Sequence, residues 1–349
     1  MTIHSHNPTP PPPRDVSPEP AEEVQEKKLD LTLRPQTFTE YIGQPEIKRN
    51  LTVAIQAAKQ RKEPLEHILV HGSPGLGKTT LAHVIAHEMG TNIRVSSGPA
   101  LERQGDIAAI ITNLEENDIF FIDEIHRLRP IVEETLYSAM EDYSIDIILG
   151  KGPSARSMRL NLPRFTLIGA TTKLSLLSSP LRDRFGHVYR LDFYSLTEIE
   201  SIIHRSASLL GMDIHKDAVA RLARSSRQTP RIANRLLRRI RDFACVEKAL
   251  TITLPLVEKT LQYMGIDVLG LDSTDRTILH AVIEKFNGGP VGLNTLAAAT
   301  HEEAETLEDI YEPFLLQCGF LERTPRGRLV TDRAYKHLGI TTHTKSKLF

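Results

Sequence analysis

The sequence has few cysteines and no long apolar run. Cys245 and Cys318 are far apart and lack the spacing of metal ligands, so we expect both to be reduced, buried apolar side chains. No apolar stretch approaches the roughly 18 residues that a membrane span needs. The first residues contain no apolar signal-peptide segment, which predicts a cytoplasmic protein.

Charge of one sign is not in excess either. The 349 residues carry 43 lysines and arginines against 44 aspartates and glutamates, which gives a net charge of −1. This balance excludes a protein that coats nucleic acid by bulk charge, so a contact with DNA must use a local basic patch or a partner. The length indicates two or three domains.

The chain divides into a tail and three segments of different pattern. Residues 1–28 are rich in proline and charge and lack aromatics, which is typical of a disordered tail and favours a dispensable one over a docking arm. Residues 29–194 alternate short apolar strands with amphipathic helices, residues 195–265 show helical periodicity alone, and residues 268–349 combine helices with a basic hairpin. Continuous apolar strands predict an α/β domain with a parallel sheet. The expected strands are Ile68–Val70, Ile93–Ser96, Ile119–Ile122, Thr166–Gly169 and Val188–Phe193.

A phosphate-binding turn follows the first of these strands. The sequence reads Gly72-x-x-x-x-Gly77-Lys78-Thr79, and an apolar-periodic helix comes next. Strand, glycine loop and helix in this order are the context of a P-loop, whose backbone N–H groups and helix N-terminus bind phosphate. Lys78 would reach the β- and γ-phosphates, and the Thr79 hydroxyl would hold Mg²⁺. The pattern therefore predicts a nucleoside triphosphate site.

Two acids end a later strand, Ile119–Ile122. Beside a P-loop, Asp123 can hold Mg²⁺ through its water shell, and Glu124 can orient and deprotonate the attacking water. An ordinary strand end is the simpler interpretation of such acids when no P-loop is present. The run up to His126 also resembles a helicase box, but such helicases carry two P-loop-like domains and this chain shows one.

Three more residue types suit a nucleotide site. A hydroxyl of Thr171 or Thr172, where the fourth strand ends, could sense the γ-phosphate, or the pair could simply end the strand. A guanidinium of Arg182 or Arg184 suits a phosphoryl transition state, or these arginines form a surface salt bridge with Asp183. Arg231 begins an arginine-rich helix and could reach a nucleotide from a second domain, whereas most of the other arginines there lie on a solvated face.

The last segment predicts a winged helix-turn-helix. The helix in the recognition position, within 301–312, carries six acids and would be repelled by phosphate. Positive charge lies instead in the hairpin at Arg323, Arg326 and Arg328, so we expect the hairpin to contact the DNA backbone without reading bases. The expected helices are 273–286, 293–299 and 303–317, with the hairpin at 319–331.

Together these residues resemble the AAA+ ATPases and, within them, the RuvB family of Holliday junction motors, over about Leu31–Thr341. The resemblance implies an AAA+ P-loop domain with a parallel sheet at 29–194, a small all-helical domain at 195–265 and a winged-helix domain at 268–349. The stretches that carry it are the P-loop, Arg34–Gln44, Leu114–Glu115, Phe121–Leu128, Met140–Tyr143, Leu167–Thr172, Ser179–Gly186, Thr229–Arg239 and Arg323–Arg328.

The resemblance also implies an ATP site shared between subunits. Arg184 would be the finger that reaches the neighbour's ATP, Thr172 the first sensor, and Arg231 the sensor from the small helical domain. Leu33 and Arg34 would lie on the adenine side. The implied nucleotide contacts are Leu33, Arg34, Gly75, Gly77, Lys78, Thr79, Thr80, Glu141, Asp142, Tyr143, Tyr194 and Arg231.

Partners follow from the same resemblance. It implies a hexameric ring that uses ATP to pump duplex DNA at Holliday junctions in recombination and repair, loaded by RuvA and joined by the RuvC resolvase in a larger complex. Residues 143–164 are similar to the hairpin that contacts RuvA. Apolar Met158 and Leu160 alternate there with polar residues, so a partner or the chain's own sheet should cover one face. The resemblance also implies an arginine where this chain has Ala304, so we expect one phosphate contact to be absent.

Two other functions stay open on the sequence. A nucleotide-switched DNA-binding regulator would need neither the base Glu124 nor an arginine that acts between subunits at Arg184. An AAA+ protein remodeller or clamp-loader-like ATPase would not need the basic wing. Measuring ATP hydrolysis with and without duplex DNA separates the motor from the switch.

Overall fold

The computed structural model describes residues 32–149 and 156–340. The tail predicted at 1–28 and the turn of the 143–164 segment lie outside these residues. The chain divides into a short unit, Met1–Arg34, and a large one, Pro35–Phe349, and each is described by itself. No helix in the described ranges is long and apolar enough to cross a membrane.

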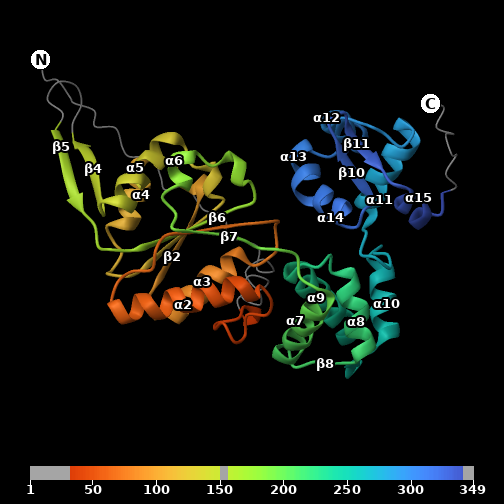
Figure 1. Ribbon diagram of the computed structural model, residues 1–349. Coiled ribbons are helices and arrows are strands. Elements are labelled where there is room, and N and C mark those ends of the chain that lie inside the picture. Colours follow the sequence, from red (N-terminus) through yellow and green to blue (C-terminus); the bar gives the residue numbers. More distant parts are fainter. Residues whose placement is uncertain (1–31, 150–155, 341–349) are drawn as a thin grey trace, which may run out of the picture. The chain divides into compact units, whose positions relative to one another are not determined.

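A five-stranded parallel sheet forms the centre of the first domain, in the order β2-β3-β6-β1-β7 (Figure 1). The predicted parallel α/β fold is therefore confirmed. The last strand ends at Arg190, three residues earlier than expected. The strands are β1 Ile68–His71, β2 Ile93–Ser97, β3 Ile119–Asp123, β6 Thr166–Thr171 and β7 His187–Arg190.

Helices cover both faces of this sheet (Figure 1). Alternate residues of a strand point to opposite faces, so Ile68 and Val70 pack with α2 and α3, while Leu69 packs with α4 and α5. Phe120 and Phe121 point to opposite faces and are both fully buried, because helices cover both faces. The helices are α2 Pro45–Arg61, α3 Lys78–Met89, α4 Gln104–Ile111, α5 Pro130–Glu141 and α6 Ser179–Arg182, with short 3-10 turns at Gly98–Ala100, Ile125–Arg127 and Leu174–Leu176.

Two antiparallel strands, β4 (Ser144–Leu149) and β5 (Arg156–Asn161), protrude from this domain (Figure 1). Their described base packs on the domain, because Ile145 is buried beside its partner Leu160. Met158 is instead exposed. The domain's own core thus covers the start of the apolar face and leaves Met158 open.

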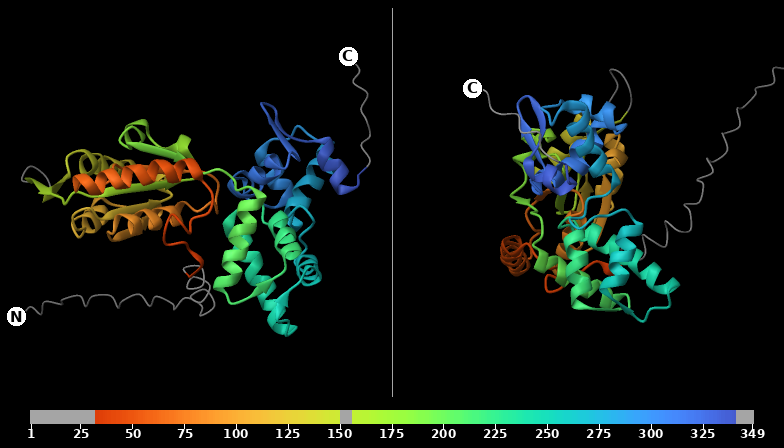
Figure 2. Two further views of the ribbon diagram at one scale, coloured as in Figure 1. Left: turned by 60° about the horizontal axis from the view of Figure 1, so that its bottom comes forward. Right: turned by 90° about the vertical axis from the view of Figure 1, so that its right-hand side faces the viewer.

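Helices dominate the second domain (Figure 2). On α9 the buried Leu236, Leu237 and Ile240 form one stripe, opposite the arginines. A small parallel pair, β8 Asp213–Ile214 and β9 Thr251–Ile252, joins the helices and was not expected. Cys245 is exposed, contrary to the prediction that it is buried, because it lies near the solvated end of α9. The helices are α7 Leu196–Leu209, α8 Lys216–Ser225, α9 Pro230–Val246 and α10 Leu254–Tyr263.

Helices and a hairpin make the third domain around a core that includes Val282, Leu315 and Phe320. The hairpin of β10 (Leu321–Thr324) and β11 (Gly327–Val330) is antiparallel and extends beyond the helices (Figure 2). The predicted winged-helix pattern is present, and a last helix, α15, is additional. The helices are α11 Ser273–His280, α12 Leu293–Thr300, α13 Ala304–Thr306, α14 Glu312–Gln317 and α15 Asp332–Leu338, with π turns at Ala281–Lys285 and Leu307–Tyr311.

Candidate nucleotide site and its partner surfaces

The P-loop joins β1 to α3 at the carboxyl edge of the sheet, where parallel strands place their ligand sites. Gly77 caps α3 with a φ of 99°, a conformation open to glycine. Gly72 passes so close to Leu191 that a Cβ there would lie 2.7 Å from the Leu191 carbonyl oxygen. The loop is thus fixed by close backbone packing, and α3 directs its N-terminal amides at the loop's concave side.

Lys78 lies inside this loop. Its side chain is buried, and Nζ donates to the carbonyl oxygens of Gly72 at 2.7 Å and Ser73 at 3.0 Å. Burial lowers the pKa of Lys78 to about 8, against the opposing effect of nearby Asp123. The ammonium is therefore held at the loop by two neutral carbonyl oxygens, an arrangement suited to binding an anionic phosphate.

Thr79, after β1, and Asp123, at the end of β3, approach each other at the carboxyl edge of the sheet, where β6 lies between the two strands. The Thr79 hydroxyl donates to Asp123 Oδ2 at 3.3 Å, and the other carboxylate oxygen accepts the backbone N–H of Glu124 at 2.9 Å. Within the described ranges no group of three or more acids, histidines or cysteines gathers to bind a metal. Two protein oxygens suit Mg²⁺, which keeps several waters and takes its other ligands from substrate phosphates.

Glu124 follows directly in a left-handed conformation, with a φ of 47°. Such a backbone is uncommon for a residue with a side chain and is typical of functional sites. Gly98 makes it possible, since a Cβ on Gly98 would collide with the Glu124 carbonyl oxygen. The half-exposed Glu124 carboxylate pairs with Arg127 through Oε2 at 3.1 Å.

The two threonines at the end of β6 have different surroundings. The predicted sensor Thr172 is half-buried beyond the strand, and its hydroxyl has no hydrogen bond among those of the described residues. Thr171 is buried instead, and its hydroxyl accepts from Lys173 N–H at 2.9 Å and bonds His126 Nδ1 at 2.8 Å. Burial lowers the pKa of His126, which favours its neutral form. His126 therefore belongs to this edge, and its place two residues after the paired acids was the available signal.

Tyr194 and Arg231 contact the P-loop. The buried Tyr194 hydroxyl donates to the Leu76 carbonyl oxygen at 3.2 Å, and Arg231 N–H lies 3.4 Å from the Gly75 carbonyl oxygen. A Cβ on Gly75 would lie 3.1 Å from that of Arg231, so this glycine admits the second domain. Gly75, Gly77 and Thr80 lie in this loop or at the start of α3, whereas Leu33 and Arg34 belong to the separate short unit.

Arg184 lies at the opposite edge of the sheet, just before β7. Its Nη2 pairs with Glu141 at 3.1 Å at the end of α5. Four residues of β1 and six of β6 separate the two edges, a distance of about 13–20 Å. Arg184 and Glu141 therefore cannot reach the P-loop of their own chain. The surface salt bridge with Asp183 is formed by Arg182, at 4.0 Å, whereas Arg184 pairs with Glu141.

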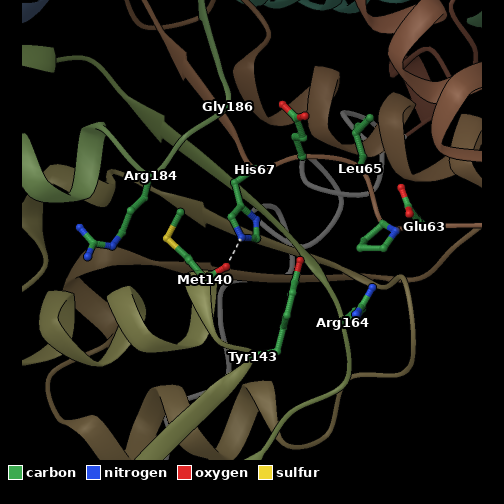
Figure 3. A pocket seen from close by; sticks show the side chains of 10 residues that line it. Glu63, Leu65, His67, Met140, Tyr143, Arg164, Arg184 and Gly186 are labelled. Atoms are coloured by element: carbon green, nitrogen blue, oxygen red, sulfur yellow. Dashed lines mark hydrogen bonds between the residues drawn. The ribbon is translucent and has the colours of Figure 1, made fainter.

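A pocket of about 370 Å³ opens at this edge, between Arg184 and Arg164 (Figure 3). His67 lies within it; Nδ1 accepts the Leu167 N–H at 2.9 Å, so Nε2 donates to the Met140 carbonyl oxygen at 3.1 Å. Tyr143 packs edge-on to Phe165 nearby, and Asp142 pairs with Arg159 of β5. Of the predicted group Glu141, Asp142 and Tyr143, Glu141 thus pairs with Arg184 and Tyr143 lines the same pocket, far from the P-loop.

The arginines of the hairpin are not equivalent. Arg326 is exposed at the turn, and Arg323 is exposed but pairs with Glu308 at 2.5 Å. Arg328 is 8% exposed, and its Nε and Nη2 bond the buried Glu312 at 3.0–3.3 Å. A guanidinium enclosed in this way cannot reach a phosphate, so the expected DNA contact of Arg328 is corrected to a role in fixing the hairpin to α14.

Comparisons with known proteins cover nearly the whole chain. Three family models match in sequence: the Holliday junction DNA helicase RuvB P-loop domain at residues 33–191, the RuvB AAA lid domain at 194–267 and the RuvB C-terminal winged helix domain at 268–339. The Holliday junction branch migration complex subunit RuvB of Dehalococcoides mccartyi is 60% identical over 313 residues, 90% of each chain. The same subunit of Chloroflexus aggregans is 57% identical over 321 residues, 92% of each chain.

Solved structures agree. The Thermotoga maritima RuvB Holliday junction branch migration motor has 53% sequence identity and a TM-score of 0.82, covering 89% of this chain and 99% of that one. A point mutant of the same Thermotoga maritima protein gives a TM-score of 0.83 at 54% identity, again covering 89% of this chain and 99% of that one. Sequence and backbone therefore match over the same three domains.

Proposed function

This chain belongs to the RuvB family, and from that membership we propose that it is an ATP-driven DNA translocase that moves Holliday junctions in recombination and repair. One observation carries the proposal. Lys78, Asp123 and Glu124 lie at one edge of the sheet, while Arg184 lies at the other, beyond reach of them. A single chain thus offers a hydrolysis site and, on its far side, a finger for a neighbour's site.

Each group has a definite task in hydrolysis. The P-loop amides and Lys78 bind the phosphates, and Thr79 with Asp123 holds Mg²⁺, which neutralises charge on the phosphate oxygens when bound. Glu124 takes the proton of the attacking water. Arg184 of the adjacent subunit donates to the γ-phosphoryl oxygens as charge spreads over them.

Other side chains close the site and sense its state. Tyr194 and Arg231 fix the second domain to the P-loop, and Leu33 with Arg34 contacts the adenine side. Thr172 responds to the γ-phosphate, with His126 and Thr171 behind it. Glu141, Asp142 and Tyr143 lie beside the nucleotide of the neighbour.

The assembly follows from this shared site. Subunits close into a hexameric ring around duplex DNA, and Arg326 and Arg323 of the wing contact its phosphates without reading bases. The β4–β5 hairpin, with Met158 exposed, takes RuvA as its partner. RuvC joins in a larger complex.

Steady-state ATP hydrolysis with and without duplex DNA tests the function. We expect DNA to stimulate the native chain and Glu124→Gln to lose about 10²- to 10⁴-fold in kcat, because the amide cannot take a proton. The variant should still bind a fluorescent ATP analogue, and Glu134→Gln, an exposed glutamate on α5, should behave as native. Native turnover by Glu124→Gln would refute the assignment of the base, and hydrolysis that ignores DNA would favour a switch or a remodeller over a motor.

A further inference from the structure

The side chain of Arg184 is held in place by its own subunit. Nη1 donates to the Pro180 carbonyl oxygen at 2.8 Å, Nη2 pairs with Glu141 at 3.1 Å, and Cζ lies 4.5 Å from the centre of the Tyr137 ring. The Nε atom is buried and has no hydrogen-bond partner in the described structure. A planar guanidinium stacked on one face and bonded along one side has little rotational freedom left.

Tyr137 is itself fixed to the segment that carries Arg184. Its hydroxyl lies 3.1 Å from Ser178 Oγ and donates to Glu133 at 3.2 Å. Ser178 caps α6, accepting the Leu181 N–H, and α6 leads directly to Arg184. On the other side, α5 is anchored by buried Leu136. The ring thus stands between two anchored helices with its face toward the guanidinium.

The contacts of Arg184 differ in how easily they exchange. The carbonyl of Pro180 and the ring of Tyr137 are compatible with a guanidinium that also donates to phosphate, because neither uses the Nη2 side. The Glu141 carboxylate does use that side, and it is mostly exposed. A phosphoryl group can therefore replace Glu141 while the contacts with Pro180 and Tyr137 remain. Arg184 can then bind the phosphoryl group without changing its rotamer.

We propose that Tyr137 is a positioning residue for Arg184. The Tyr137 ring holds the guanidinium in place, so that Arg184 needs only to exchange Glu141 for phosphate when it binds the neighbour's ATP. The inference rests on the proposed function, in which Arg184 acts on a neighbour's ATP. It predicts that the ring of Tyr137, rather than its hydroxyl, supports turnover, and that the loss appears in the neighbour's site.

Tyr137→Leu and Tyr137→Phe in the full chain separate the two parts of the side chain. Phenylalanine keeps the π face and loses the bonds to Ser178 and Glu133, whereas leucine removes the face. We expect Tyr137→Leu to lower kcat for ATP about ten- to hundredfold with KM nearly unchanged, and Tyr137→Phe to stay within about twofold of native. Equal losses in the two variants would overturn the proposal, and Tyr137→Met replaces leucine if that variant does not fold.

Mixed assemblies locate the defect. Glu124→Gln subunits lack the base but keep the finger, whereas Tyr137→Leu subunits keep the base. Mixing them should therefore create sites with both groups intact and raise ATP hydrolysis above that of either variant alone. Absence of this rescue would overturn the inference, since a defect within the variant's own site cannot be complemented.

Arg184→Ala in the same mixture distinguishes the role of Tyr137 from the action of Arg184 between subunits. If Glu124→Gln rescues Arg184→Ala but not Tyr137→Leu, the role of Tyr137 fails and the shared site stands. If Arg184→Ala is not rescued, the finger does not act between subunits, and the proposed function fails at that point, whatever Tyr137 does.

Discussion

Lys78 is the residue whose protonation should report nucleotide binding. Burial holds its pKa at about 8, with Asp123 opposing the shift and Arg231 adding to it. Between pH 8 and about 10.5 the unfolded chain binds more protons at this position than the folded chain does, so the stability of the folded protein rises with pH across that window. At lower pH the folded protein is less stable because it holds a buried, charged ammonium in the loop without a phosphate partner.

We predict that ATP binding at pH 8 takes up about half a proton per site at Lys78, because phosphate favours the charged lysine and half of it is neutral beforehand. The measurement is the calorimetric enthalpy of ATP binding in buffers of different ionisation enthalpy. Lys78→Arg provides the control, since a guanidinium is protonated throughout. The same buffer dependence in both proteins would show that the proton goes elsewhere.

The residues that sequence could predict are those whose partners are close in the chain or fixed by a motif. Lys78 and Thr79 follow from the P-loop, and Asp123 follows from its place at a strand end beside it. Arg328 could not be assigned, because its partner Glu312 lies 16 residues away on another element and both look like surface charges in the sequence. The bond between His126 and Thr171 could not be predicted, because it depends on β3 and β6 being neighbours in the sheet.

Among the larger elements, strands were predicted well because buried parallel strands are continuous apolar runs. The β8–β9 pair was missed, since two residues per strand leave no period to detect. The hairpin was predicted from its turn and charges, but which arginines face solvent depended on its packing against α14. Sequence thus located the wing, and only the structure shows which of its arginines face solvent.

Because Arg328 is enclosed by Glu312, we expect Arg326 at the exposed turn of the hairpin to contact phosphate. Arg326→Ala should weaken duplex binding evenly across sequences and flatten the dependence of log affinity on log salt by about one unit, because one phosphate contact is lost. Fluorescence anisotropy over a salt series measures both quantities.

Arg328→Met is the matched control for this experiment. It removes a buried partner of Glu312, so we expect it to lower the free energy of unfolding by roughly 3 kcal/mol in urea while leaving the salt slope unchanged in folded protein. A flattened slope with Arg328→Met and none with Arg326→Ala would reverse the assignment.

The three domains form one motor only if DNA at the wing and nucleotide at the P-loop affect each other. Arg227 lies at a junction suited to this, four residues before Arg231 in the loop between α8 and α9. Its Nη2 bonds both Asp272 and the fully buried Asp275 of the winged-helix domain, and its Cζ lies 4.9 Å from the centre of the Phe314 ring. A shift of Arg231 can therefore reach the DNA-binding domain through a few rigid contacts.

We predict that Arg227→Met keeps ATP hydrolysis without DNA within about twofold of native and loses its stimulation by duplex DNA. Burial raises the pKa of Asp275 to about 7, which Arg227 opposes, so removing Arg227 favours the protonated acid still more. The free energy of unfolding that the variant loses should then be greater at pH 8 than at pH 5.5. At pH 8 the native protein holds Asp275 ionised beside Arg227, and the variant cannot, whereas at pH 5.5 Asp275 is protonated in both. Urea unfolding at the two pH values measures this difference, and Asp275→Asn added to Arg227→Met should remove it. Stimulation by DNA that survives in the folded single variant would show that coupling takes another route.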